Sequence, residues 1–138
     1  MSRCLLYTYN PAAGAVAAGE NIPTGALGSI VRRHGCAASP SSLSGIQLTE
    51  EGYYKIFATA KATAAAAGTL TLTLRQDGTA VPGATVSAAA AAAGDEITLE
   101  LPAAAVRVLR CPCRSVLTFT LTGGAATAST ISCLVDKD

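Results

Sequence analysis

Residues 68–78 read GTLTLTLRQDG, and in this segment leucine and threonine alternate strictly. Successive side chains of an extended chain point to opposite faces, so the three leucines share one face and the three threonines the other. We therefore predict a β-strand with one buried face. Asp77-Gly78 predicts a hairpin turn after it, because both residues tolerate positive φ. Val81-Pro82-Gly83 predicts a second bend, followed by a returning strand over 84–88.

The same two-residue period recurs along the rest of the chain. Apolar residues recur at every second position in segments 54–60, 97–101, 117–121 and 131–135, and only threonine or glutamate lies between them in 97–101 and 117–121. Gly, Pro, Asn or Asp residues lie between these segments, which is the punctuation expected of turns. Six or more short strands separated in this way predict an all-β sandwich or barrel.

Two alanine tracts, 64–67 and 88–93, test this interpretation, because alanine is the best helix former. A helix over 88–93 would be less than two turns long, and isolated helices of that length are marginal even in alanine. Gly94-Asp95 follows at once and predicts a turn. We interpret both tracts as strand ends and connecting loops, with a short helical turn at 88–93 as the alternative.

The length and patterning favour one domain over residues 1–138. Residues 45–138 form its patterned strand core. Residues 1–44 mix Gly, Pro and Ser with short apolar pieces, which predicts less regular edge strands and loops, or an arm, wrapped on the sandwich. Half of the residues are apolar but only 4% are aromatic, so Ala, Val, Leu and Ile must fill the core.

The charge content excludes several partners. The net charge is +1, and the basic groups Arg32-Arg33 and Arg107/Arg110/Arg114 have no interleaved aromatic residues, so we expect no nucleic-acid partner. No segment approaches the ~20 apolar residues that span a bilayer, so we expect no membrane partner. The first residues predict a mature N-terminus rather than a secretion signal. Charged residues amount to only 14%, and hiding surface in an oligomer is one way to keep such a chain soluble.

The five cysteines show no regular spacing of a disulfide framework, and reduced thiols are expected. His34, Cys36, Cys111 and Cys113 together have enough nitrogen and sulfur for a tetrahedral zinc site. However, His-x-Cys and Cys-x-Cys are not the usual zinc spacings, and nothing in the sequence brings the two segments together. Thiols that fill small gaps in the core are the favoured interpretation.

No constellation of catalytic residues is recognisable. The acidic pairs Glu50-Glu51 and Asp95-Glu96 are adjacent residues, which point to opposite faces of a strand, whereas a catalytic carboxylate pair must flank one cleft. His34 next to Cys36 has no third group to orient it. There is no phosphate-binding loop and no nucleophile elbow. We therefore expect no enzymatic activity, no catalytic residue and no cofactor.

The ordered set of segments is similar to a known superfamily. GIQLTEEGYYKIFATAKAT (45–63), LTLRQDGTAVPGA (72–84), AAGDEITLEL (92–101) and ASTISCLVDKD (128–138) resemble, in this order, strands and turns of the tumour necrosis factor and complement globular-head jelly-roll domains. The resemblance covers 45–138 and is nearest to bacterial and phage members. Animal members are richer in aromatic residues, and this chain has no collagen-like stalk.

The resemblance implies a TNF-like, antiparallel jelly-roll β-sandwich that assembles as a homotrimer around a three-fold axis. Ala and Thr would allow close approach at the axis, and Tyr53, Tyr54 and Phe57 are the candidate larger residues of the trimer contact. Packing inside the subunit is the alternative role for these aromatic residues.

A short version without a stalk resembles a phage virion protein, a capsid-decoration or head-fibre component that is assembled in the bacterial host cytoplasm. Its expected partners are itself and other virion or capsid proteins. The alternative function is a receptor- or carbohydrate-binding module, for which Tyr7 and Tyr9 are candidate stacking residues. A cupin-type enzyme is disfavoured because the chain has a single histidine.

Overall fold

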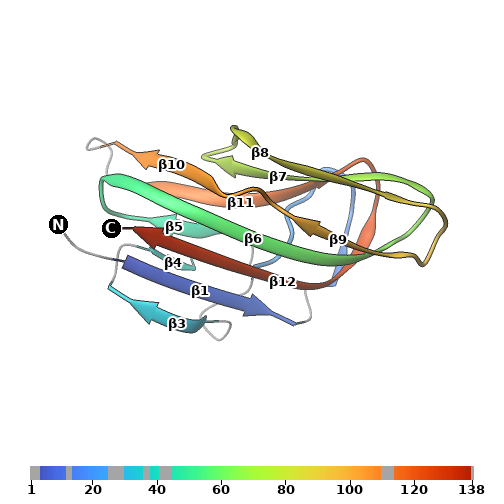
Figure 1. The fold of residues 1–138 in the computed structure, drawn as a ribbon, viewed down its shortest axis with the longest axis horizontal. Coiled ribbons are helices and arrows are strands. Elements are labelled where there is room, and N and C mark those ends of the chain that lie inside the picture. Colours follow the sequence, from blue (N-terminus) through green and yellow to red (C-terminus); the bar gives the residue numbers. More distant parts are fainter. Residues whose placement is uncertain are drawn as a thin grey trace.

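The computed structural model describes residues 4–11, 14–24, 30–35, 38–40, 45–109 and 114–137, and these residues contain strands, turns and loops but no helix. Nothing in this part of the chain could therefore serve as a membrane-spanning helix. The strands form two antiparallel sheets that face each other (Figure 1). The predicted all-β architecture is confirmed.

The larger sheet has seven strands: β1 (Cys4–Asn10), β2 (Gly14–Val16), β3 (Ile30–His34), β6 (Gly52–Ala64), β9 (Glu96–Glu100), β10 (Ala104–Val108) and β12 (Ala126–Lys137). Its order is β10-β6-β12-β1-β3, and β9 and β2 pair with β6 and β12. The smaller sheet has five strands: β4 (Ala38–Pro40), β5 (Ile46–Leu48), β7 (Gly68–Gln76), β8 (Thr79–Ala90) and β11 (Ser115–Thr122). Its order is β4-β5-β11-β7-β8.

The core lies between the two sheets and consists of the apolar face of each alternating strand. The three leucines of β7 are at most 3% exposed, and Leu117, Phe119 and Leu121 of the neighbouring β11 are fully buried. The facing strands β6 and β12 contribute their own inward rows, including Ile56 and Val135. Each such side chain stabilises the fold by about 1.5–3 kcal/mol relative to its exposed state. The predicted inward faces of all five patterned segments are confirmed.

The alanine tracts end strands and form turns, as predicted. β6 ends at Ala64 and β8 at Ala90, and the following residues lie in turns. The carboxylate of Asp95 accepts hydrogen bonds from the backbone N–H groups of Ala91 and Ala92, at 3.0 and 3.1 Å. Because this cap satisfies the turn locally, the alternative of a helical turn at 88–93 is wrong.

The β7–β8 hairpin turns at Asp77-Gly78, where φ is 52° and 83°. The Asp77 side chain also accepts a hydrogen bond from the Val116 N–H at 2.9 Å, which fixes the turn on β11. β8 already begins at Thr79, and the predicted second bend at 81–83 is an irregularity of pairing within this one strand. The returning strand is therefore longer than the sequence suggested.

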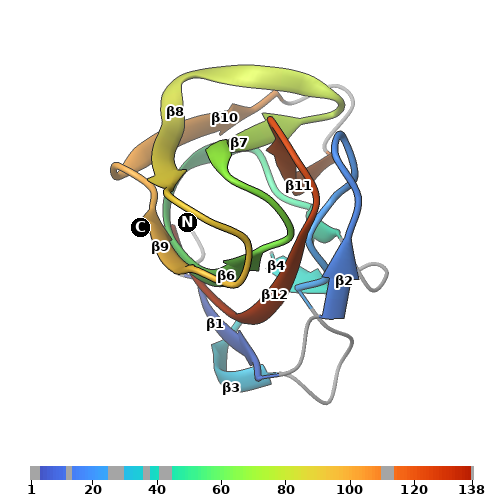
Figure 2. The same cartoon turned by 90° about the vertical axis from the view of Figure 1, so that its right-hand side faces the viewer.

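In the first third of the chain, β3 and β4 end their sheets. β1 lies inside its sheet, because it pairs with β12 on one side and β3 on the other. β1 begins and β12 ends at the same end of the sandwich (Figure 1). Seen from the opposite end, β8 of the smaller sheet lies beside β9 of the larger one, which closes that side of the sandwich (Figure 2).

Candidate functional site

The outward face of the seven-stranded sheet has an apolar centre. Tyr7 of β1 is paired with Leu134 of β12, and Leu134 is paired with Phe57 of β6. Paired residues of antiparallel strands point to the same face, so these three side chains form one row across three adjacent strands. We call them the apolar row. Tyr7 and Leu134 are half-buried, and Phe57 is 41% exposed.

Further aromatic and charged residues surround this row. Tyr9, 41% exposed, lies two residues along β1 from Tyr7, and Tyr53, 68% exposed, lies four residues before Phe57 on β6. On the next row of the sheet, Lys55 of β6 is paired with Asp136 of β12. An apolar centre with a polar and charged rim is the usual anatomy of a protein–protein interface.

The structure separates the three aromatic residues predicted from the sequence. Tyr53 and Phe57 are exposed on the outward face, as a subunit contact requires. Tyr54 is fully buried between the sheets, and its hydroxyl donates a hydrogen bond to the backbone carbonyl of Glu50 at 2.7 Å. Tyr54 therefore packs within the subunit, which was the alternative role for these aromatic residues. It differs from Tyr53 because adjacent residues of a strand point to opposite faces.

The same end of the sandwich holds a buried charge. Lys137 is 3% exposed, and its Nζ lies 4.0 Å from Oε2 of Glu50. The aliphatic part of this side chain passes over Gly52, where an added Cβ would lie 3.0 Å from Lys137 Cε. The glycine thus leaves room for the lysine, and the end of β12 is held against the turn between β5 and β6.

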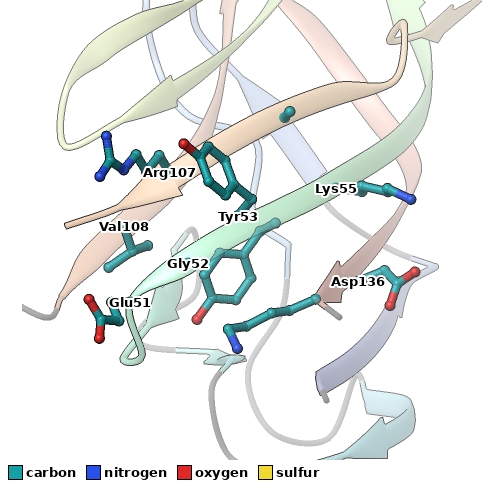
Figure 3. A pocket seen from close by; sticks show the side chains of 10 residues that line it. Glu51, Gly52, Tyr53, Lys55, Arg107, Val108 and Asp136 are labelled. Carbon is teal, nitrogen blue, oxygen red and sulfur yellow. The ribbon is translucent and has the colours of Figure 1, made fainter. Parts of the chain in front are cut away.

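A hollow of about 590 Å³ opens beside this turn, between the start of β6, β10 and the end of β12 (Figure 3). Tyr53 and Arg107, which are paired across β6 and β10, form one part of its wall. The Arg107 guanidinium carbon lies 5.7 Å from the centre of the Tyr53 ring, within the range of a cation–π contact. Lys55 and Asp136 line it as well.

Most of the weakly predicted metal site lies outside the described residues. Cys36, Cys111 and Cys113 belong to segments that the structure does not describe, and His34 is exposed at the end of β3. Among the described residues no group of three or more His, Cys, Asp or Glu side chains could hold a metal ion. The zinc site was the disfavoured alternative in the sequence analysis, and it stays untested.

The two described cysteines, Cys4 and Cys133, are buried between the sheets. Cys133 lies on β12 between Thr8 and Ala58 of the neighbouring strands. Burial raises the pKa of the Cys133 thiol from 9.0 to about 12, because desolvation disfavours the thiolate.

We expect iodoacetamide at pH 8 to leave Cys133 unmodified in the folded protein and to alkylate it once guanidinium unfolds the chain. Peptide mass spectrometry separates this cysteine from the others.

The raised pKa of Cys133 also predicts how the free energy of unfolding changes with pH. Between about pH 9 and pH 12 the unfolded thiol loses its proton and the folded one keeps it, so the free energy of unfolding should fall as the pH rises. Alkylation of native Cys133 at the unfolded rate would contradict this placement.

Comparison with known proteins supports the fold. No family model matches the sequence, and no curated protein matches it. Among solved structures, murine APRIL superposes with a TM-score of 0.70 at 9% identity, over 99% of this chain and 100% of that one. The Eiger TNF from S. frugiperda gives 0.68 at 9% identity, over 100% and 94%. PRD1 vertex protein P5 gives 0.57 at 21% identity, over 97% and 96%.

These superpositions include the first third of the chain, which the sequence resemblance did not reach. At such low identities they establish the architecture alone. The apolar row and the hollow therefore lie on a scaffold that the chain shares with murine APRIL, Eiger TNF and PRD1 vertex protein P5. The chain has an all-β, antiparallel jelly-roll fold of the TNF-like type.

Proposed function

We propose that this chain is a non-enzymatic structural protein of a bacteriophage virion, which assembles as a homotrimer and decorates the capsid or forms a short head fibre. The observation that carries the proposal is the apolar row on the outward face of the seven-stranded sheet, on a fold shared with a phage vertex protein. It is assembled in the bacterial host cytoplasm and then resides on the virion, with itself and other virion proteins as partners.

The physical argument for self-association rests on surface that one subunit leaves uncovered. Phe57 and Tyr9 are each 41% exposed, although the chain has only two phenylalanines and four tyrosines. Covering apolar area contributes roughly 25 cal/mol per Å². A contact between two different patches, repeated around a closed ring, covers this face in every copy. Three copies are the number that the family resemblance implies.

Phe57 is the main residue of the proposed contact, because it is the most exposed side chain of the apolar row. Tyr53 lies at the end of the same face, near the charged pair Lys55 and Asp136, and belongs to the rim. Tyr54 has no part in the contact, since it is fully buried within the subunit. Tyr7 and Leu134 join Phe57 as contact residues.

The virion setting is tested by locating the protein on particles. An antibody raised against this chain should decorate purified phage particles in immunogold electron microscopy, at a fixed number of sites per particle. Labelling only of the soluble fraction of the lysate, with particles left bare, would contradict the virion role. That result would not contradict the proposed trimer, because the trimer is tested by the mass of the protein in solution.

A further inference from the structure

The hollow at the end of β6 has the size of a ligand site. Its volume of about 590 Å³ lies within the ~300–1,000 Å³ range of small-molecule pockets. Its walls come from three adjacent strands of one sheet, so their spacing is set by the sheet hydrogen bonds. Ala105 of β10 has a small side chain and is paired with Lys55, which leaves space between the longer neighbours.

An aromatic ring stands at this hollow with its surface open. Tyr53 is 68% exposed, the largest exposed fraction among the large hydrophobic residues of the described chain. The Arg107 guanidinium, 5.7 Å from the ring centre, covers one face and orders the ring. So large an exposed fraction leaves the opposite face of the ring to solvent. That face suits a ligand with a flat C–H surface.

The strand that carries Arg107 is held in place from the other sheet. Nε2 of Gln76 donates hydrogen bonds to the backbone carbonyl of Arg107 at 2.8 Å and to Oγ of Ser115 at 3.1 Å. Gln76 belongs to β7 and Ser115 to β11, so β10 is fixed against the smaller sheet at the position of the ring contact. A binding wall fixed before the ligand arrives loses less entropy on binding.

Apart from Lys137, which is paired with Glu50, the charged side chains that line the hollow are two cations and two carboxylates. Lys55 and Arg107 supply positive donors, and Glu51 and Asp136 supply carboxylate acceptors (Figure 3). The ion pair within the described residues is Lys137 with Glu50, so these four side chains have no ion-pair partner there. Lys55 and Asp136 face outward as cross-strand neighbours and are both available to a ligand.

From this juxtaposition we propose that the hollow binds a neutral saccharide of one or two rings. Each sugar hydroxyl both donates and accepts hydrogen bonds, which matches a wall of two cations and two carboxylates. A phosphate or a free carboxylate would gain from Arg107 and Lys55 but would be repelled by Asp136 and Glu51. The apolar face of the sugar ring stacks on the open face of Tyr53.

This site lies at the rim of the proposed subunit contact, away from Phe57. Tyr53 and Phe57 are four residues apart on β6, which is about 13 Å along a strand. The site therefore predicts that sugar binding and assembly respond to different substitutions. Substitution of Tyr53 should abolish sugar binding in a chain that still trimerises, whereas substitution of Phe57 should abolish assembly.

The test uses the full chain on an array of immobilised neutral and acidic glycans, followed by saturation-transfer NMR with the free sugars that bind. We expect binding to neutral glycans, and the Tyr53→Ala variant to bind at least tenfold more weakly. Tyr53→Phe keeps the ring and should bind within about twofold of the wild type. Val31→Ala shortens an exposed apolar side chain of the same sheet outside the hollow and should leave binding unchanged.

Three results would overturn the proposal. They are the absence of binding to any glycan by folded protein, binding to acidic glycans alone, and equal binding by the wild type and Tyr53→Ala. Circular dichroism of each variant confirms that the sheets are intact, so a loss through unfolding is distinguished from a loss of the site.

Discussion

The Phe57→Asp variant should be a folded monomer under conditions where the wild type is a trimer. Phe57 is the most exposed side chain of the apolar row, and a carboxylate at this position would be buried without a partner in each of the three contacts. We expect at least a hundredfold loss of association affinity, which corresponds to about 2.7 kcal/mol per contact. Sedimentation velocity over a concentration series measures it.

The fold should survive this substitution, because Phe57 is 41% exposed in the subunit and its side chain points away from the core. Phe57→Leu is the matched control. It keeps an apolar side chain in the row and should remain trimeric. Unchanged association of Phe57→Asp would place the subunit contact elsewhere on the molecule and would refute the role of the apolar row.

The second large effect is a loss of stability, which we expect from a substitution in the turn between β11 and β12. Gly123 has a φ of 91°, and an added Cβ would lie 2.2 Å from the backbone oxygen of Thr69. Residues other than glycine rarely adopt that φ. In addition, the added Cβ would clash with the backbone of Thr69, which cannot rotate away as a side chain can. Gly123→Ala should therefore lower the free energy of unfolding by roughly 3–5 kcal/mol, measured by urea denaturation.

Gly19→Ala separates the two causes. Gly19 has a similar φ of 86°, but nothing lies within 4 Å of its added Cβ. This variant should lose only the conformational part, about 1–2 kcal/mol. If both variants lost the same amount, the close approach of the β11–β12 turn to β7 would not be a feature of the folded protein.

Most of the strands could be predicted because the information is local. The leucine–threonine alternation of β7 fixes which side chains face the core, and Asp77-Gly78 fixes the turn that follows. The central position of β1 could not be predicted in this way. Its inward row includes Thr8, which is polar yet 2% exposed, so the apolar period is broken in the sequence and restored only by the sheet.

The candidate surface was predicted in part for the same reason. Phe57 and Tyr53 stand out as aromatic residues on an alternating strand. Tyr7 and Leu134 lie far apart in the sequence from each other and from Phe57, and their place in one row depends on the register of three strands. The alternation did contain the signal for Tyr54, because it shares its face with Ile56, which is buried.

The measurement that tests the account most directly is the mass of the wild-type protein in solution, by light scattering coupled to size-exclusion chromatography. A trimer covers the apolar row and predicts three times the chain mass of 13.7 kDa across a range of concentrations. A single species of 13.7 kDa would leave the apolar row exposed to water and would contradict the proposed assembly.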